Sequence, residues 1–197
     1  MYMRLLQRVI FFGVLLMMIS ACGGLRFSEV APDIGDFHPG KICVFPVDTG
    51  AYTEVAAIAD DIIAETAGDQ GFISGVIAPA SLKKRMDNDD SLKQTVTDYL
   101  AKLKAVHFSD PDMSRHIGEA CDVDSLLVVG VDFWNYTRLK DDKLAKVGFS
   151  MALIEAQTGK IIWKAKHYET KGYNWFKPDL DDLAEEVADT MISRMPH

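Results

Sequence analysis

The sequence is short of the residues from which catalytic and nucleic-acid-binding sites are usually built. It has three cysteines and five histidines in 197 residues, and 29 acidic side chains outnumber 21 lysines and arginines. A formal net charge of -8 disfavours a binder of the phosphate backbone, because such binding depends on clustered cations. We therefore expect no nucleic-acid partner.

Recognisable catalytic patterns are missing as well. No serine lies in a Gly-x-Ser-x-Gly turn, and no glycine-rich phosphate loop follows an apolar run of strand type. Asp132 follows the strongest apolar run and is the best-placed acid for a cleft, although a turn role is commoner for such an aspartate. We predict that the protein is not an enzyme, and a hydrolase of envelope polymers is the alternative that Asp132 leaves open.

Metal-binding patterns are incomplete. The nearest approach to a zinc site comprises His107, Asp110, Asp112 and His116, but a helical His-x-x-x-His or a paired-cysteine spacing is absent. We interpret this region as a helix cap. The segment 87–90 has calcium-loop acids without the required glycine and glutamate, so we predict a solvated turn. No metal and no dissociable cofactor are expected.

The N-terminus carries an apolar run too short for a permanent membrane span. Val9 to Ile19 is apolar and is followed by Ser20-Ala21, whereas a spanning helix needs about 20 such residues. Arg4 and Arg8 precede the run, and this order of cations, apolar core and small residues is typical of a secretory signal peptide. We predict a signal peptide at 1–21, and losing its two cations from -8 leaves -10 for the mature chain.

The end of this segment, Ile19-Ser20-Ala21-Cys22, resembles a bacterial lipobox. The resemblance implies cleavage after Ala21 and a diacylglyceryl thioether on Cys22, with acylation of the new amine. Each buried CH₂ contributes about 0.8 kcal/mol, and two or more chains hold a protein stably on a bilayer. Gly23 stands where an aspartate signals inner-membrane retention in enterobacteria, so the resemblance implies an outer-membrane anchor with the domain in the periplasm.

Two further cysteines belong to the mature domain. Export places Cys43 and Cys121 in a compartment where disulfides persist. Free cysteine is also among the most buried residue types. A bridge and a pair of buried thiols therefore both remain open.

Composition and periodicity divide the mature chain into two parts. Residues 22–40 are rich in Gly, Pro, Asp and Ser and are predicted to form a flexible tether behind the lipidated cysteine. Residues 41–197 are predicted to form one α/β domain of mixed α+β character, with a central mixed sheet of about five strands. The predicted strands are 41–47, 72–78, 126–134 and the antiparallel hairpin 146–155 with 160–169; the predicted helices are 55–66, 79–103 with a break at Asn88, 113–121 and a closing helix from Pro178.

This order of elements resembles the α/β domain shared by several envelope lipoproteins. The matching segments are 41–47, 124–130 and the hairpin turn Thr158-Gly159-Lys160-Ile161-Ile162-Trp163. The group includes the curli-secretion lipoprotein, lipoprotein activators of peptidoglycan synthases and the N-terminal domain of TolB. The chain lacks the long amphipathic insertion from which the curli pore builds its barrel. The resemblance implies a structural or binding role in the envelope.

Aromatic residues provide the candidate partner surface, because Trp and Tyr are enriched at protein interfaces. The candidate residues are Trp134, Tyr136, Tyr173 and Trp175, with Phe133 and Phe176 beside them. The alternative is that these rings only cover the core at strand ends. We expect a membrane-anchored binding or scaffolding domain that acts on another envelope protein, the second hypothesis being an oligomeric component of an outer-membrane secretion or assembly apparatus.

Overall fold

A six-stranded mixed sheet and the helices on its two faces make up residues 25–35 and 37–197, which the computed structural model describes. The predicted signal peptide and Cys22 lie outside these residues. The elements in chain order are β1 (Phe27–Val30), β2 (Lys41–Val44), η1 (Thr53–Val55), α2 (Ala56–Gly68), β3 (Gly75–Ile77), α3 (Pro79–Asn88), α4 (Asp90–Val106), α5 (Pro111–Cys121), β4 (Ser125–Leu139), β5 (Asp142–Glu155), β6 (Ile161–Tyr173) and α6 (Leu180–Ile192).

The strands lie in the order β1-β6-β5-β4-β2-β3. Strand β2 runs parallel to β3 and β4, whereas β4, β5, β6 and β1 pair antiparallel in succession. The predicted mixed α/β class with a closing C-terminal helix is thus confirmed. The sheet has one strand more than expected, because β1 forms in the segment that we predicted to be a tether.

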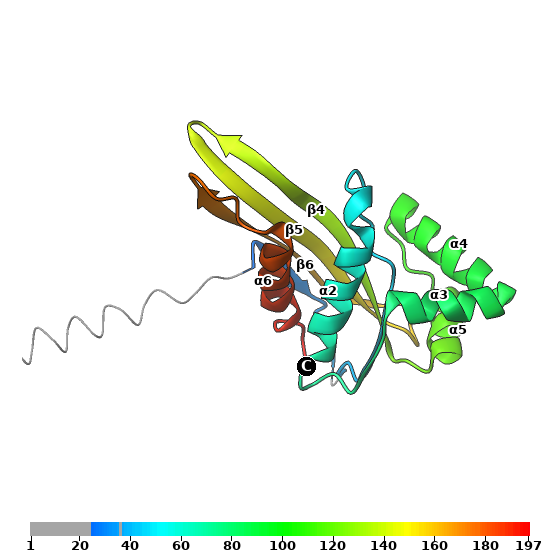
Figure 1. The fold of residues 1–197 in the computed structure, drawn as a ribbon. Coiled ribbons are helices and arrows are strands. Elements are labelled where there is room, and N and C mark those ends of the chain that lie inside the picture. Colours follow the sequence, from blue (N-terminus) through cyan, green and yellow to red (C-terminus); the bar gives the residue numbers. More distant parts are fainter. Residues whose placement is uncertain (1–24, 36) are drawn as a thin grey trace, which may run out of the picture.

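Strand β2 is buried on both faces because helices cover each of them. Ile42 and Val44 face a first core cluster, which includes side chains of α2 and α6. Cys43 and Phe45 face a second cluster, which includes side chains of α3, α4 and α5. Figure 1 shows α2 and α6 together over the sheet and the other three helices as a separate group. The continuous apolar run of β2 follows from this position between two layers.

The N-terminal segment differs from the expected flexible tether. Phe27–Val30 pairs antiparallel with β6, Phe27 lying opposite Lys166 and Val30 opposite Trp163. All four residues of β1 are exposed, so backbone hydrogen bonds to a sheet edge replace the core contacts that a sequence pattern would reveal. Pairing with the sheet is therefore present from Phe27, five residues after Cys22 in the sequence.

Strands β4 and β5 form a long hairpin that projects beyond the helices (Figure 1). Its register shifts between Val131 and Phe133, where Val131 lies opposite Phe149 and Phe133 lies opposite Gly148. Asp132 is the extra residue of this β-bulge, and a bulge reverses the alternation of faces that follows it. The described helices include none that is long and apolar enough to cross a bilayer.

Candidate functional site

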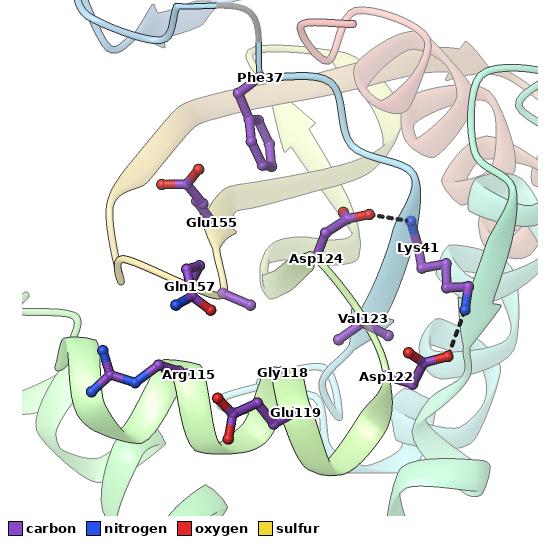
Figure 2. Close-up of a pocket in the computed structure, with 11 residues that line it drawn as sticks. Phe37, Lys41, Arg115, Gly118, Glu119, Asp122, Val123, Asp124, Glu155 and Gln157 are labelled. Atoms are coloured by element: carbon purple, nitrogen blue, oxygen red, sulfur yellow. Dashed lines mark hydrogen bonds and ion pairs between the residues drawn. The ribbon is translucent and has the colours of Figure 1, made fainter.

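The two ends of the sheet carry different surface features. At the end where β2 and β4 begin, a cavity of about 450 Å³ opens between the sheet and the C-terminal half of α5. Figure 2 shows charged side chains around it, including Arg115 and Glu119 from α5 and Glu155 from the end of β5. Phe37 lies over its opposite side. Because charged side chains line it, this cavity is the first place to seek chemistry.

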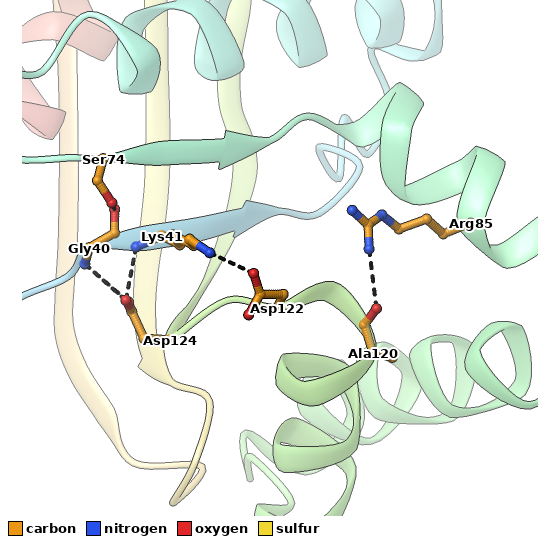
Figure 3. Close-up of polar contacts among 7 residues, drawn as sticks. All are labelled: Gly40, Lys41, Ser74, Arg85, Ala120, Asp122 and Asp124. Atoms are coloured by element: carbon orange, nitrogen blue, oxygen red, sulfur yellow. Dashed lines mark hydrogen bonds and ion pairs between the residues drawn. The ribbon is translucent and has the colours of Figure 1, made fainter.

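The acids of this cavity hold the chain together (Figure 3). The backbone N–H groups of Gly40 and Lys41 donate to the Asp124 carboxylate at 3.1 and 2.8 Å. The Lys41 ammonium donates to Asp122 at 2.5 Å and holds the pKa of that carboxyl below its usual range. A Cβ on Gly40 would approach Asp124 Oδ2 to 2.9 Å, which explains the glycine. These contacts join the start of β2 to the start of β4.

Asp122 is not suited to be a proton donor in general acid catalysis. A catalytic acid needs a pKa raised towards the working pH, whereas Asp122 is held ionised by its lysine. Ligands of parallel sheets also favour the carboxyl ends of the strands, and this cavity lies where parallel β2 and β4 begin. We interpret the cavity as a polar joint between strands.

The opposite end of the sheet carries the aromatic loop, which we define as Tyr173 to Pro178 between β6 and α6. Trp175 is 92% exposed and Phe176 is 89% exposed. Burying such a side chain removes about 150–250 Å² from water, so two adjacent exposed rings are an unusual solvent-facing apolar surface. A cavity of about 480 Å³ lies within the loop, between these rings and Asp182 of α6.

The base of the aromatic loop is fixed by Tyr136 of β4. Its hydroxyl donates to the Pro178 carbonyl at 2.8 Å, and its ring meets that of Tyr173 edge-on with centroids 5.8 Å apart. The Lys177 ammonium lies 4.5 Å from the centre of the Tyr136 ring. Desolvation and the nearby Asp179 raise the pKa of Tyr136. The loop is therefore attached to the hairpin at both of its ends.

Of the four residues predicted to form a partner surface, the structure brings together Tyr136, Tyr173 and Trp175. Trp134 belongs to the core instead: it is 6% exposed and meets Phe149 edge-on at 6.2 Å. The physical reason is the bulge at Asp132, which turns Trp134 rather than Phe133 towards the first core cluster. Phe133 lies on the other face, beneath the Lys146 ammonium at 3.2 Å.

The two domain cysteines lie next to each other in the second core cluster. Both are free thiols, Cys43 on β2 and Cys121 at the end of α5. Hydrogen bonding between them lowers the pKa of Cys121 to about 7 and, together with burial, raises that of Cys43. Of the two alternatives that the sequence left open, a bridge and a pair of buried thiols, the structure contains the buried thiols. Cys22 lies outside the described residues.

Two of the aspartates weighed as metal ligands, Asp110 and Asp89, cap helices. Asp110 accepts hydrogen bonds from the backbone N–H groups of Asp112 and Met113 at the start of α5. Asp89 does the same for Leu92 at the start of α4. Residues 25–35 and 37–197 contain no group of His, Cys, Asp and Glu arranged to hold a metal ion. The helix-cap interpretation of the region after His107 is thus confirmed.

One surface feature escaped the sequence analysis altogether. A largely apolar groove of about 610 Å³ lies between α4 and the sheet. Its walls come from β1, α4, β4, β5, β6 and the segment after β2. Periodicity predicts single elements, whereas this hollow is formed by residues of several elements that meet only in the folded chain.

Comparison with known proteins identifies the fold and no family. No family model matches the sequence, and no curated protein matches it. Among solved structures, the PelC dodecamer of Paraburkholderia phytofirmans is 19% identical, with a TM-score of 0.52 over 85% of this chain and 93% of that one. The hypothetical protein CT253 of Chlamydia trachomatis is 8% identical, with a TM-score of 0.53 over 79% and 94%. Lipoprotein GNA1162 of Neisseria meningitidis is 16% identical, with a TM-score of 0.49 over 80% and 100%.

The matches to PelC and CT253 show that the chain shares its α/β architecture with these two proteins. At such low identity, the PelC and CT253 matches show a shared fold and nothing of function. The chain spans nearly the whole of each of those proteins, so the shared fold is the complete domain rather than a part of it. One of the similar structures, GNA1162, is described as a lipoprotein.

Proposed function

We propose that this chain is a lipid-anchored envelope protein whose domain binds another envelope protein through the aromatic loop and has no catalytic role. The observation that carries the proposal is the adjacent pair Trp175 and Phe176, which are 92% and 89% exposed. Trp and Phe are both enriched at protein interfaces relative to the rest of the surface. A pair of such rings that the domain leaves uncovered supports a surface for a partner.

The attachment of the loop strengthens this argument. Binding by a mobile segment loses affinity, because its side chains must be ordered on association. Here the hydrogen bond from Tyr136 to the Pro178 carbonyl and the contact of Tyr136 with Tyr173 hold the two ends of the loop. The ordering of the loop backbone is thus largely complete before a partner arrives.

The direction of β1 relates the loop to the proposed anchor. Strand β1 runs antiparallel to β6, so the chain enters β1 from the end of the sheet at which β6 leads into the aromatic loop. Cys22 precedes Phe27 by five residues, and five residues span at most about 17 Å. A lipid on Cys22 would hold the domain close to an outer-membrane leaflet, with the aromatic loop on the side of the anchor.

A pull-down of the full lipoprotein from native envelope tests the proposal. The double variant Trp175→Ala, Phe176→Ala is expected to lose a partner that the wild type retains. Phe108→Ala is the matched control, because Phe108 is an exposed aromatic residue between α4 and α5. If wild type and double variant recover the same proteins, or if both recover none, the proposal is wrong. Release of the double variant from the membrane fraction would instead assign the loop to the bilayer.

A second candidate function is that of a homo-oligomeric envelope component. The shared fold with PelC, whose structure is a dodecamer, supports it. Light scattering after size exclusion, on a form that begins at Gly23, separates the two candidates. A defined oligomer favours this second function, whereas a monomer favours a domain that binds a different protein.

A further inference from the structure

The apolar groove beneath α4 has the size and lining of a small-molecule site. Its volume of about 610 Å³ lies within the range of about 300–1,000 Å³ for such sites. Side chains of Leu100 and Leu103 form the helix wall, and Val128 and Ile161 lie in the sheet floor. All four are half-buried, so the groove exposes aliphatic surface that the fold itself does not cover.

The groove lies beside the last part of α4, which follows the helix's buried residues. The buried residues of α4 end at Tyr99, and the helix then continues to Val106. Small residues face this last part of the helix from the floor, where Gly130 lies opposite Ser150 and Ala152 follows on the same face of β5. Large side chains at these positions would fill the hollow, as they do in an ordinary core.

Cations lie at the open side of the groove. Lys164 and Lys166 of β6 are exposed on one face of the strand, and neither is in an ion pair within the described part of the chain. Glu29 lies across from Lys164 in the register with β1. At the helix side, Lys104 pairs with Asp48 at 2.5 Å. The two unpaired lysines thus give the mouth a positive charge in a chain whose net charge is -8.

We propose that this groove binds a fatty acid, with the acyl chain along the aliphatic walls and the carboxylate at Lys164 and Lys166. An apolar trough with cations at one side matches an amphiphile that has an apolar chain and an anionic head. Each buried CH₂ of the chain contributes about 0.8 kcal/mol. Exposed Phe27 of β1 lines the same groove, so the mouth opens near the segment that carries the proposed lipid anchor.

Binding of decanoate to a form that begins at Gly23 tests the assignment without the anchor or any partner. Both core clusters, with the residues packed against them, fall between Leu25 and Met195, so this form retains the whole folded unit. Calorimetric titration at neutral pH is expected to show one decanoate per chain. Decanol is expected to bind about tenfold more weakly, and butyrate not at all, because the first lacks the charge and the second lacks the chain.

Three variants separate the walls from the mouth. Ala152→Phe fills the floor and is expected to abolish decanoate binding. Lys164→Gln with Lys166→Gln is expected to weaken decanoate about tenfold and to leave decanol unchanged, a difference that altered folding would not produce. Lys83→Gln with Lys93→Gln removes the same charge from exposed positions on α3 and α4 and is the matched control, with binding like that of the wild type.

The assignment is overturned by any of three results. The first is that the wild-type protein does not bind decanoate. The second is that Ala152→Phe protein is folded by circular dichroism and still binds decanoate. The third is that the variant with Lys164→Gln and Lys166→Gln binds decanoate as tightly as its control. If Ala152→Phe does not fold, the mouth variant decides, since both of its substitutions lie on the surface. None of these outcomes depends on the aromatic loop, so the proposed envelope function stands or fails separately.

Discussion

At the end of the sheet where β2 and β4 begin, charged side chains pair with one another and with the backbone; at the end where β6 stops, aromatic side chains face solvent. At the first end the Asp124 carboxylate accepts hydrogen bonds from two backbone N–H groups. At the second end the rings of Trp175 and Phe176 are exposed. Polar groups that satisfy each other hold strands together. Uncovered rings contribute little to the stability of the fold. When a partner covers them, their apolar surface is removed from water, and this favours binding.

Alanine substitutions of Trp134 and Trp175 test this comparison, and Trp134→Ala has the largest expected effect on the free energy of unfolding. Trp134→Ala is expected to lower the free energy of unfolding by about 3–5 kcal/mol, because it removes a buried ring from the first core cluster. Trp175→Ala is expected to stay within about 0.5 kcal/mol of wild type. Urea unfolding measures both, and equal effects of the two substitutions would break the distinction between core and surface.

The joint at Asp124 is expected to have the next largest effect. Asp124→Ala removes the acceptor of the N–H groups of Gly40 and Lys41. Because these groups are accessible to water, the loss is expected to be about 0.5–1.5 kcal/mol, the net contribution of a typical hydrogen bond. Asp122→Ala is the control, since its side chain is 86% exposed in the ion pair with Lys41 and such pairs contribute about 0–1 kcal/mol. A larger loss for Asp122→Ala than for Asp124→Ala in urea would contradict the proposed joint.

Acid is expected to weaken the ion-paired aspartates of the domain gradually. Lysine partners lower the pKa of Asp48, Asp110 and Asp122, so each binds a proton more readily in the unfolded chain. The stability that they contribute is present above the unfolded aspartate pKa of about 3.9 and is lost as pH falls through the lower folded values. Raised pKa values at Asp60 and Asp181 oppose this trend.

Thermal melting from pH 6 to pH 2 measures the balance. The melting temperature is expected to decrease once the pH is below about 4. Lys41→Met should flatten that fall slightly, because it removes the partner of Asp122. A melting temperature that rises on acidification would show that Asp60 and Asp181, whose pKa values are raised, dominate the pH dependence instead.

The smallest expected effect is that of the aromatic loop on stability. Replacing Trp175 and Phe176 together by alanine is expected to change the melting temperature by no more than about 2 °C, since exposed substitutions alter stability by about 0.5 kcal/mol or less. A drop comparable with that of Trp134→Ala would show that the loop is part of the fold, and the proposed partner surface would then be wrong.

The sequence predicted the elements whose side chains alternate against a core. The apolar runs at β2 and β4 and the helical stripe of α6 are confirmed in type and position. Strand β1 was missed because its residues are exposed and are held through the backbone of β6. Trp134 was misplaced because one extra residue at Asp132 reverses the faces of β4, and composition does not reveal a bulge.

The candidate site was predicted in part for a related reason. Tyr136 and Tyr173 are far apart in sequence, yet pairing of β4 with β5 and of β5 with β6 brings both to the same end of the sheet. The sequence shows that both residues are aromatic, and it predicted that they lie on the same surface. The groove beneath α4 was not readable, because it is formed by residues of several elements that meet only in the folded chain.

Site-specific photocrosslinking in living cells tests the central claim most directly. A photoreactive phenylalanine analogue at position 175 of the full lipoprotein is expected to give one discrete protein adduct in the envelope, and the same group at position 108 is expected to give none. No protein adduct from position 175, or the same adduct from both positions, would contradict a partner surface at the aromatic loop.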